Sequence, residues 1–321
     1  MKHLLTVEHL GRADIERIMD RAESFAEVGR RDIKKVPTLR GRTIVNLFLE
    51  SSTRTSSSFE LAAKRLSADV VSVKSTGSSV EKGESLKDTV ATLSAYHPAA
   101  IVIRSPHAGA AELITRWTDA SVINAGDGKH EHPSQALLDV YTLRTRLGSL
   151  ERRKIWIVGD VLHSRVARSN ILAFGAMGAE VTVCGPPTLI PREIESLGCR
   201  VAYALDGAEE ADVIYALRMQ RERMGESFVP SLREYAAGYQ IDSRRLSPRQ
   251  LLMHPGPVNR GVELSPEVID SPNSLIAEQV ESGLVVRMAI LYELLAGGER
   301  PGGARSRPQD VSEPSPIGEP A

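Results

Sequence analysis

Short apolar runs rich in β-branched residues alternate with helical patterns along this chain of 321 residues, and that alternation constrains its fold most strongly. The runs typical of strands are residues 43–49, 70–73, 100–103, 121–124, 154–158, 180–183, 212–216 and 250–253. Strands that alternate with helices pair in parallel, because each helix returns the chain to the same end of the sheet. The sequence therefore predicts an α/β protein with two parallel-sheet domains.

A helix predicted between the two series of strands indicates where the domains join. Pro133 lies in its first turn and Gly148 at its end, which is the usual placement of these two residue types. Its apolar face carries Leu137, Val140, Leu143 and Leu147. A last amphipathic helix is predicted at 281–295, and the Pro- and Ser-rich tail at 301–321 is predicted to be disordered.

Composition and charge narrow the class of protein. The chain is 41% hydrophobic, enough for two domains with cores of their own, and its 40 basic residues nearly balance its 41 acidic ones. A net charge of -1 gives no overall field to recruit nucleic acid or a membrane surface. Cys184 and Cys199 are too few for a disulfide framework or a thiolate metal site. With no signal-type or membrane-spanning apolar run, we expect a cytoplasmic protein.

The stretch FLESSTRTSSSFE at residues 48–60 indicates a phosphate-binding turn. It follows a predicted strand and precedes helical spacing, so Ser52, Thr53, Arg54 and Thr55 fall where backbone N–H groups lack helical partners. Those donors, the positive helix end and the Arg54 guanidinium favour an anion, and each charge-assisted hydrogen bond contributes roughly 1.5–3 kcal/mol. A serine-rich N-cap without a ligand is the alternative for this turn.

Polar segments also follow the other predicted strands. They are residues 74–88, Arg104, residues 127–135 with His132, residues 160–165, residues 184–187, Arg218 with Gln220, and residues 254–260. Ligands of open parallel sheets bind outside the carboxyl ends of the strands. Two polar edges that face one cleft would therefore form a site.

Several of these segments resemble the aspartate carbamoyltransferase family, in that family's order. They are LFLESSTRTSSSFE at 47–60, SSVEKGESLKDT at 78–89, IVIRSP at 101–106, NAGDGKHEHPSQALLD at 124–139, VGDVLHSRVARS at 158–169, ALRMQRER at 216–223 and HPGPVNRGVE at 254–263. The resemblance implies transfer of a carbamoyl group from carbamoyl phosphate to the amine of L-aspartate, an early committed step of pyrimidine synthesis.

The same resemblance implies a domain division. Residues 1–131 with 285–300 would form a carbamoyl phosphate-binding domain, and residues 132–284 an aspartate-binding domain. The active-site cleft would lie between them, and the C-terminal helix would pack back on the N-terminal domain.

The resemblance also implies roles for individual residues toward carbamoyl phosphate. The phosphate ligands would be Ser52, Thr53, Arg54 and Thr55. The donors to the carbonyl oxygen would be Thr55, Arg104 and His132, since developing negative charge there calls for fixed donors. The groups around the carbamoyl NH2 would be the Gln135 side chain and the carbonyls of Pro255 and Gly256. Pro-Gly-Pro stiffens those carbonyls but is also a common turn, so a purely structural role for Pro257 is the alternative.

For aspartate, the implied ligands are cations and an amide: Lys82, Arg165, Arg218 and Gln220. Arginine suits this role because it binds a carboxylate through two parallel hydrogen bonds. The alternative for Arg165 is a solvated position on a helix that starts near Ser164.

The segment at 74–88 reads by itself as a mobile surface loop. The resemblance implies that Ser78 and Lys82 of this loop enter the active site of an adjacent subunit, so that the protein is a homotrimer with shared sites. Whether regulatory chains or a pathway enzyme join the trimer is left open.

The implied mechanism is direct attack of the amine on the carbonyl, after carbamoyl phosphate has bound first, with no cofactor, metal or covalent intermediate. Its catalytic residues would be Arg54, Thr55, Lys82, Arg104 and His132. His132 would act as a hydrogen-bond donor and not as an obligatory base.

Four other functions fit the sequence less well. Ornithine carbamoyltransferases share the phosphate turn, but Glu50, LRMQ and HPGP stand where they usually carry lysine, an SMG-type loop and HCLP. A dehydrogenase would need G-x-G-x-x-G where VGDVLHSR stands. The spacing of His130 and His132 before Pro133 suits a turn better than a zinc site. A non-catalytic phosphate-binding protein would leave Gln135, Arg218 and Gln220 unexplained.

The chain departs from the family pattern at Ser56, where many relatives have arginine or another long residue after S-T-R-T.

Overall fold

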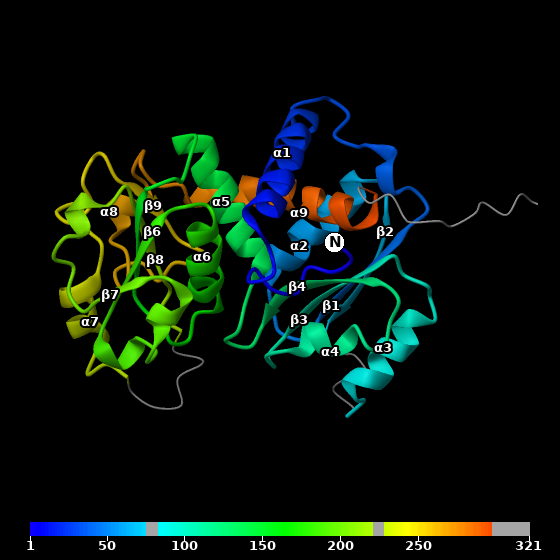
Figure 1. Ribbon diagram of the computed structural model, residues 1–321, viewed down its shortest axis with the longest axis horizontal. Coiled ribbons are helices and arrows are strands. Elements are labelled where there is room, and N and C mark those ends of the chain that lie inside the picture. The colour runs from blue at the N-terminus through cyan, green and yellow to red at the C-terminus, as the bar shows by residue number, and fades with distance from the viewer. Residues whose placement is uncertain (75–82, 221–227, 297–321) are drawn as a thin grey trace, which may run out of the picture.

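The computed structural model describes residues 1–74, 83–220 and 228–296, which form two parallel sheets, one in each half of the molecule (Figure 1). The first sheet has the order β2–β1–β3–β4, with β1 at Thr43–Phe48, β2 at Asp69–Lys74, β3 at Ala100–Ser105 and β4 at Ser121–Asp127. The second has the order β7–β6–β5–β8–β9, with β5 at Lys154–Val158, β6 at Glu180–Cys184, β7 at Arg200–Ala202, β8 at Val213–Ala216 and β9 at Leu251–Met253. The predicted α/β class is confirmed, and β7 is a strand that the sequence did not predict.

Helices connect and cover these strands. The α-helices of the described ranges are α1 (Arg12–Gly29), α2 (Thr53–Arg65), α3 (Leu86–Ser94), α4 (Ala110–Ile114), α5 (Pro133–Leu147), α6 (Arg165–Ala176), α7 (Leu232–Tyr239), α8 (Pro266–Ile269) and α9 (Ile276–Leu295). Short 3-10 turns are η1 (Pro37–Leu39), η3 (Pro187–Leu189), η4 (Ile194–Leu197) and η5 (Ala208–Glu210). None of the helices in the described ranges combines the length and the apolar content that a membrane span requires.

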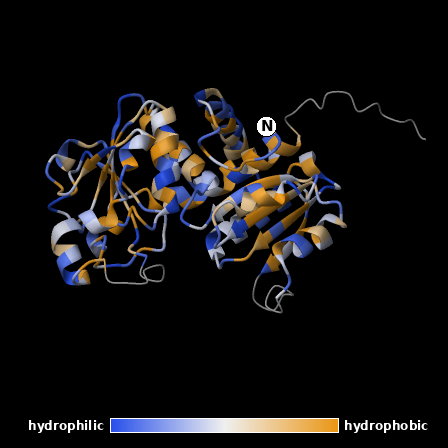
Figure 2. Ribbon diagram, turned by 60° about the horizontal axis from the view of Figure 1, so that its bottom comes forward, coloured by the Kyte–Doolittle hydropathy of each residue, from blue (hydrophilic) through white to orange (hydrophobic). Residues whose placement is uncertain are grey.

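The first sheet is covered on both faces. Ile44 and Phe48 of β1 pack in a core with apolar residues of α1, α2 and α9, whereas Val45 and Leu47 pack in a second core with α3 and α4. Successive side chains of a strand point to opposite faces, so both faces of β1 must be apolar. Figure 2 shows the apolar colouring concentrated on the strands of both sheets.

The second sheet shares its core with the first. Ile155 and Ile157 of β5 belong to the same apolar cluster as Ile44, together with residues of α5 and α6. Trp156 and Val158 face the other way and pack with Val268 of α8. A continuous core therefore runs through both halves of the molecule by way of α5 and α9.

The helix α9 packs back on the first half of the chain, against α1, α2 and α5, as predicted for the C-terminal helix. The Nε atoms of Arg17 and Arg21 on α1 donate to the Glu293 carboxylate at 3.0 and 3.2 Å. The helix begins at Ile276 and not at the predicted residue 281. The predicted disordered tail at 301–321 lies outside the described residues.

Replacing Leu291 with alanine should destabilise the protein because its side chain is fully buried in the packing of α9. We expect the free energy of unfolding to fall by about 2–5 kcal/mol, the cost of removing a core leucine side chain and leaving a cavity. Leu113→Ala is the matched control, since Leu113 is 39% exposed. Denaturant unfolding measures both, and equal losses would contradict the role of α9 in the core.

Candidate active site

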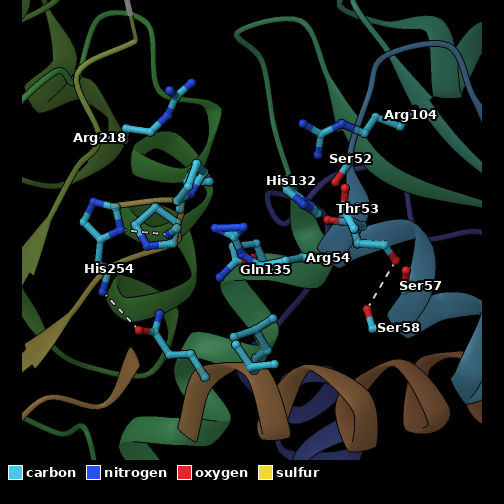
Figure 3. A pocket seen from close by; sticks show the side chains of 18 of the residues that line it. Ser52, Thr53, Arg54, Ser57, Ser58, Arg104, His132, Gln135, Arg218 and His254 are labelled. Carbon is cyan, nitrogen blue, oxygen red and sulfur yellow. Dashed lines mark hydrogen bonds between the residues drawn. The ribbon is translucent and has the colours of Figure 1, made fainter. Parts of the chain in front are cut away.

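A cavity of about 840 Å³ lies between the two sheets. It is lined by every predicted site residue that the structure describes: Ser52, Thr53, Arg54, Thr55, Arg104, His132, Gln135, Arg165, Arg218, Gln220, Pro255 and Gly256. Figure 3 places Arg218 on one side of this cavity and Arg104 on the other. Ser78 and Lys82 lie outside the described residues, so their predicted roles stay predictions.

The turn before α2 differs from three other serine N-caps of the described chain and shares its lack of a capping contact with Ser265 before the four-residue α8. Ser85, Ser164 and Ser231 each accept a hydrogen bond from the backbone N–H three residues later, which is the usual capping contact. Ser52 caps no N–H group among the described residues, although α2 begins directly after it. Its helix start is therefore left open toward the cavity, which favours anion binding over the plain N-cap alternative.

The guanidinium of Arg54 extends from this turn to the 254–257 segment of the second half. A β-carbon added to Gly256 would lie 2.5 Å from Nη2 of Arg54, and φ of Gly256 is +63°. Only glycine allows this close approach at that backbone conformation. The Arg54 guanidinium therefore reaches from the phosphate turn to the Gly256 backbone, within the cavity that both residues line.

His254 fixes the shape of the segment that carries Pro255 and Gly256. Its Nδ1 accepts from the Gly256 N–H at 2.8 Å, so Nε2 carries the proton and donates to Glu263 at 3.2 Å. Burial lowers the pKa of His254, which keeps the ring neutral. The sequence pattern HPGP indicated a turn but gave no sign of this internal support.

Glu50 is a residue of the site whose contacts the sequence did not predict. Its Oε1 accepts from Nη2 of Arg104 at 3.1 Å and from Nη2 of Arg165 at 2.8 Å, and its Oε2 accepts from Nη1 of Arg165 at 2.9 Å. Arg165 is buried, so its alternative interpretation as a solvated helix residue was wrong. One carboxylate thus joins a β3 strand end to the start of α6 in the other half.

The start of α5 brings His132 and Gln135 to the cavity. The His132 backbone N–H donates to Oγ of Ser169 at 2.8 Å, and that hydroxyl donates to Oε2 of Glu131 at 3.0 Å. Nε2 of Gln135 donates to Oδ1 of Asp139 at 3.1 Å. Both predicted ligands are thereby held by buried partners.

The residues next to His132 have structural roles. Glu131 also accepts from the Val7 N–H at 2.8 Å, and Nδ1 of His130 contacts Asp127 at 3.1 Å. These contacts brace the turn between β4 and α5. In the described ranges, no group of three or more His, Cys, Asp or Glu side chains is arranged to hold a metal ion.

The second half contributes Arg218 and Gln220 from the segment that follows β8. The Gln220 backbone N–H donates to Oδ2 of Asp160 at 3.2 Å, and Oδ1 of Asp160 contacts Nδ1 of the buried His163 at 2.8 Å. Asp160 follows β5, so neighbouring strand ends meet here as the parallel topology requires.

Two family models match the chain. The model described as "Aspartate/ornithine carbamoyltransferase, carbamoyl-P binding domain" matches residues 2–145, and "Aspartate/ornithine carbamoyltransferase, Asp/Orn binding domain" matches residues 151–294. The chain belongs to the aspartate/ornithine carbamoyltransferase family. The dehydrogenase interpretation of the second half is thereby excluded.

Individual carbamoyltransferases are similar over nearly the whole chain. The aspartate carbamoyltransferase catalytic subunit of Acidothermus cellulolyticus is 55% identical over 93% of this chain and 94% of its own length. The catalytic subunit of Salinispora arenicola is 54% identical over 94% of this chain and 100% of its own. A crystal structure of Trypanosoma cruzi aspartate transcarbamoylase with carbamoyl phosphate and aspartate is 33% identical, with a TM-score of 0.83, and covers 92% of this chain and 97% of that one.

Placing a side chain at Gly256 tests the anion site of this carbamoyltransferase. We expect Gly256→Ala to displace the Arg54 guanidinium and to weaken inorganic phosphate binding at least roughly tenfold, the worth of one charge-assisted hydrogen bond. Calorimetric titration measures the affinity.

Gly261→Ala provides the matched control for this substitution. Gly261 also has a positive φ, +84°, but no atom lies within 4 Å of an added β-carbon. Both variants share the backbone strain, so only the contact with Arg54 differs. Equal phosphate affinities in the two variants would show that Arg54 does not bind the phosphate.

Proposed function

We propose that this chain transfers the carbamoyl group of carbamoyl phosphate to the α-amine of L-aspartate, giving N-carbamoyl-L-aspartate and phosphate. The observation that carries the proposal is one cavity with an open helix start and Arg54 on one side and Arg165, Arg218 and Gln220 on the other. This arrangement suits two anionic substrates bound face to face. The reaction is an early committed step of de novo pyrimidine synthesis.

The names of the relatives support the same substrates. The Acidothermus and Salinispora proteins are called aspartate carbamoyltransferase catalytic subunits, and the similar Trypanosoma structure holds carbamoyl phosphate and aspartate. An ornithine substrate would bring its cationic side chain toward Arg218, which disfavours the ornithine branch of the family.

The first chemical step is attack of the aspartate amine on the carbamoyl carbon. The carbonyl becomes a tetrahedral oxyanion, and Thr55, Arg104 and His132 are the donors proposed to stabilise it, at about 3 kcal/mol for one well-placed donor. Collapse of this intermediate breaks the bond to the phosphate oxygen, and the departing phosphate accepts the amine proton. His132 therefore need not act as a base.

Holding the two substrates close together and correctly oriented supplies the rest of the rate acceleration. Ser52, Thr53 and Arg54 would hold the phosphate. Arg218 would hold one aspartate carboxylate through the bidentate geometry of arginine, and Arg165, whose Nη1 and Nη2 donate to Glu50, would hold the other through its further N–H groups. Fixing both reactants in register removes an entropic barrier of up to about 7–11 kcal/mol. Gln135 and the Pro255 and Gly256 carbonyls would orient the carbamoyl NH2.

The assembly and location that we propose rest on the family and not on contacts of this chain. We propose a cytoplasmic homotrimer in which Ser78 and Lys82 serve the site of an adjacent subunit. The term catalytic subunit in the relatives' names fits a further assembly with other chains. We keep the proposed division into residues 1–131 with 285–300 and residues 132–284.

The substrate assignment is tested by phosphate release from carbamoyl phosphate with purified full-length protein. We expect release that depends on L-aspartate and a product with the mass of N-carbamoyl-aspartate. L-Ornithine should give no release above background. Ornithine-dependent turnover would overturn the aspartate assignment and leave the phosphate site standing.

The role of Arg218 is tested by Arg218→Gln. Loss of its bidentate contact should raise KM for aspartate roughly 10- to 100-fold and leave the affinity for carbamoyl phosphate within about twofold. Arg200→Gln is the control, because Arg200 is an exposed arginine on β7 in the same half of the molecule, paired with Glu180 at 2.9 Å. Steady-state kinetics distinguishes the two, and an unchanged KM for aspartate in Arg218→Gln would exclude the contact.

A further inference from the structure

A fully buried carboxylate lies one helical turn after Gln135 on α5. Asp139 has no exposed surface and accepts four hydrogen bonds from four different segments. The donors are Nε2 of Gln135 at 3.1 Å, Nε2 of Gln279 at 2.7 Å, Nδ2 of Asn170 at 3.0 Å and the hydroxyl of Tyr215 at 2.7 Å. Asp139 lines no part of the cavity, so it does not itself touch a substrate bound there.

An ionised carboxylate accepts hydrogen bonds and cannot donate them, so it fixes which end of each neighbouring amide faces it. With its Nε2 on Asp139, Gln135 can turn only its Oε1 toward the cavity that it lines. Gln279 likewise donates through Nε2, and its Oε1 accepts from the backbone N–H of His254 at 3.0 Å. His254 directly precedes Pro255 and Gly256, whose carbonyls are the other proposed acceptors for the carbamoyl NH2.

We propose that Asp139 is a positioning residue that determines specificity for a carbamoyl donor: it holds the Gln135 and Gln279 amides so that only acceptors surround the substrate NH2. The inference rests on the proposed function, because it concerns recognition of the carbamoyl group within that same site. It predicts that Asp139 is what lets the site prefer carbamoyl phosphate over acetyl phosphate, which carries a methyl group in place of the NH2.

The groups around Asp139 allow its carboxylate to be ionised at neutral pH. Burial raises its pKa to about 6, and the four donors oppose that effect. The titratable groups that face it are Tyr215 on β8 and Arg287 on α9, while α6 contributes the neutral Asn170. Burial raises the pKa of Tyr215 well above its usual range and lowers that of Arg287 to about 10, so neither titrates near the pKa of Asp139.

The first test compares the affinities of the full-length protein for carbamoyl phosphate and acetyl phosphate, without aspartate, in wild type and Asp139→Asn. Asparagine keeps the shape but carries one donor NH2 and one acceptor oxygen, so it no longer requires the Nε2 ends of both glutamines to face it. We expect wild type to prefer carbamoyl phosphate at least roughly tenfold and the variant to prefer it less than about threefold. Inorganic phosphate affinity serves as the control for folding and should stay within about twofold.

The second test measures the two affinities as a function of pH. Both ligands carry a phosphate group, so the ratio of their affinities removes the effect of phosphate titration. As pH falls through about 6, Asp139 takes up a proton and becomes a donor, so the wild-type preference should decline. Tyr215→Phe removes one donor that stabilises the ionised form, and the midpoint of the decline should move up by about one pH unit. This variant removes only a hydroxyl, so it tests the assignment even where Asp139→Asn does not fold.

The outcomes separate this inference from the function on which it rests. A wild type that transfers the carbamoyl group, with an unchanged preference in Asp139→Asn or an unmoved midpoint in Tyr215→Phe, overturns the role of Asp139 alone. Equal loss of carbamoyl, acetyl and inorganic phosphate binding in Asp139→Asn would show a merely structural role and also overturn it. A wild type with neither transfer nor preference overturns both proposals.

Discussion

The cavity depends first on the carboxylate of Glu50, which holds the guanidinium groups of Arg104 and Arg165 from opposite halves of the molecule. Two cations this close would repel one another, and removing the carboxylate would take away the ion pair of the buried Arg165. The fork of Arg165 takes both carboxylate oxygens, so the pair fixes orientation as well as distance. The strand ends of both sheets are thereby brought to one place, and the remaining polar groups of the site are arranged around them.

A second shared feature is that ligand-facing groups have buried partners that set their orientation. Gln135 is held by Asp139, the segment after His254 by Glu263, and the Gln220 backbone by Asp160. Such support places donors and acceptors before a substrate arrives, so that no reorganisation is needed during the reaction. This arrangement buries charged and amide groups, and each of them needs a hydrogen-bond or ion-pair partner inside the protein to offset its loss of hydration.

Local sequence pattern predicted most strands and the open turn at residues 52–55, because β-branched runs and helical spacing are properties of short segments. Parallel topology then predicted that polar strand ends would converge. The three-residue β7 is too short for such a pattern. The helix α1 (Arg12–Gly29) was not predicted either. Its sequence has an apolar face, but Gly11 before it has no side chain that could cap the helix. The burial of Arg165 could not be predicted, since its partner Glu50 is 115 positions away in the chain.

The return of α9 to the first half also has a consequence for how the protein is made. The apolar face of the first sheet that lies toward α1 and α2 is completed by a helix from the far end of the described chain. During synthesis from the N-terminus, the four strands of that sheet emerge long before the helix that finishes their covering. The nascent chain must therefore carry an incompletely covered hydrophobic surface until translation is nearly over, and such a surface is prone to aggregate.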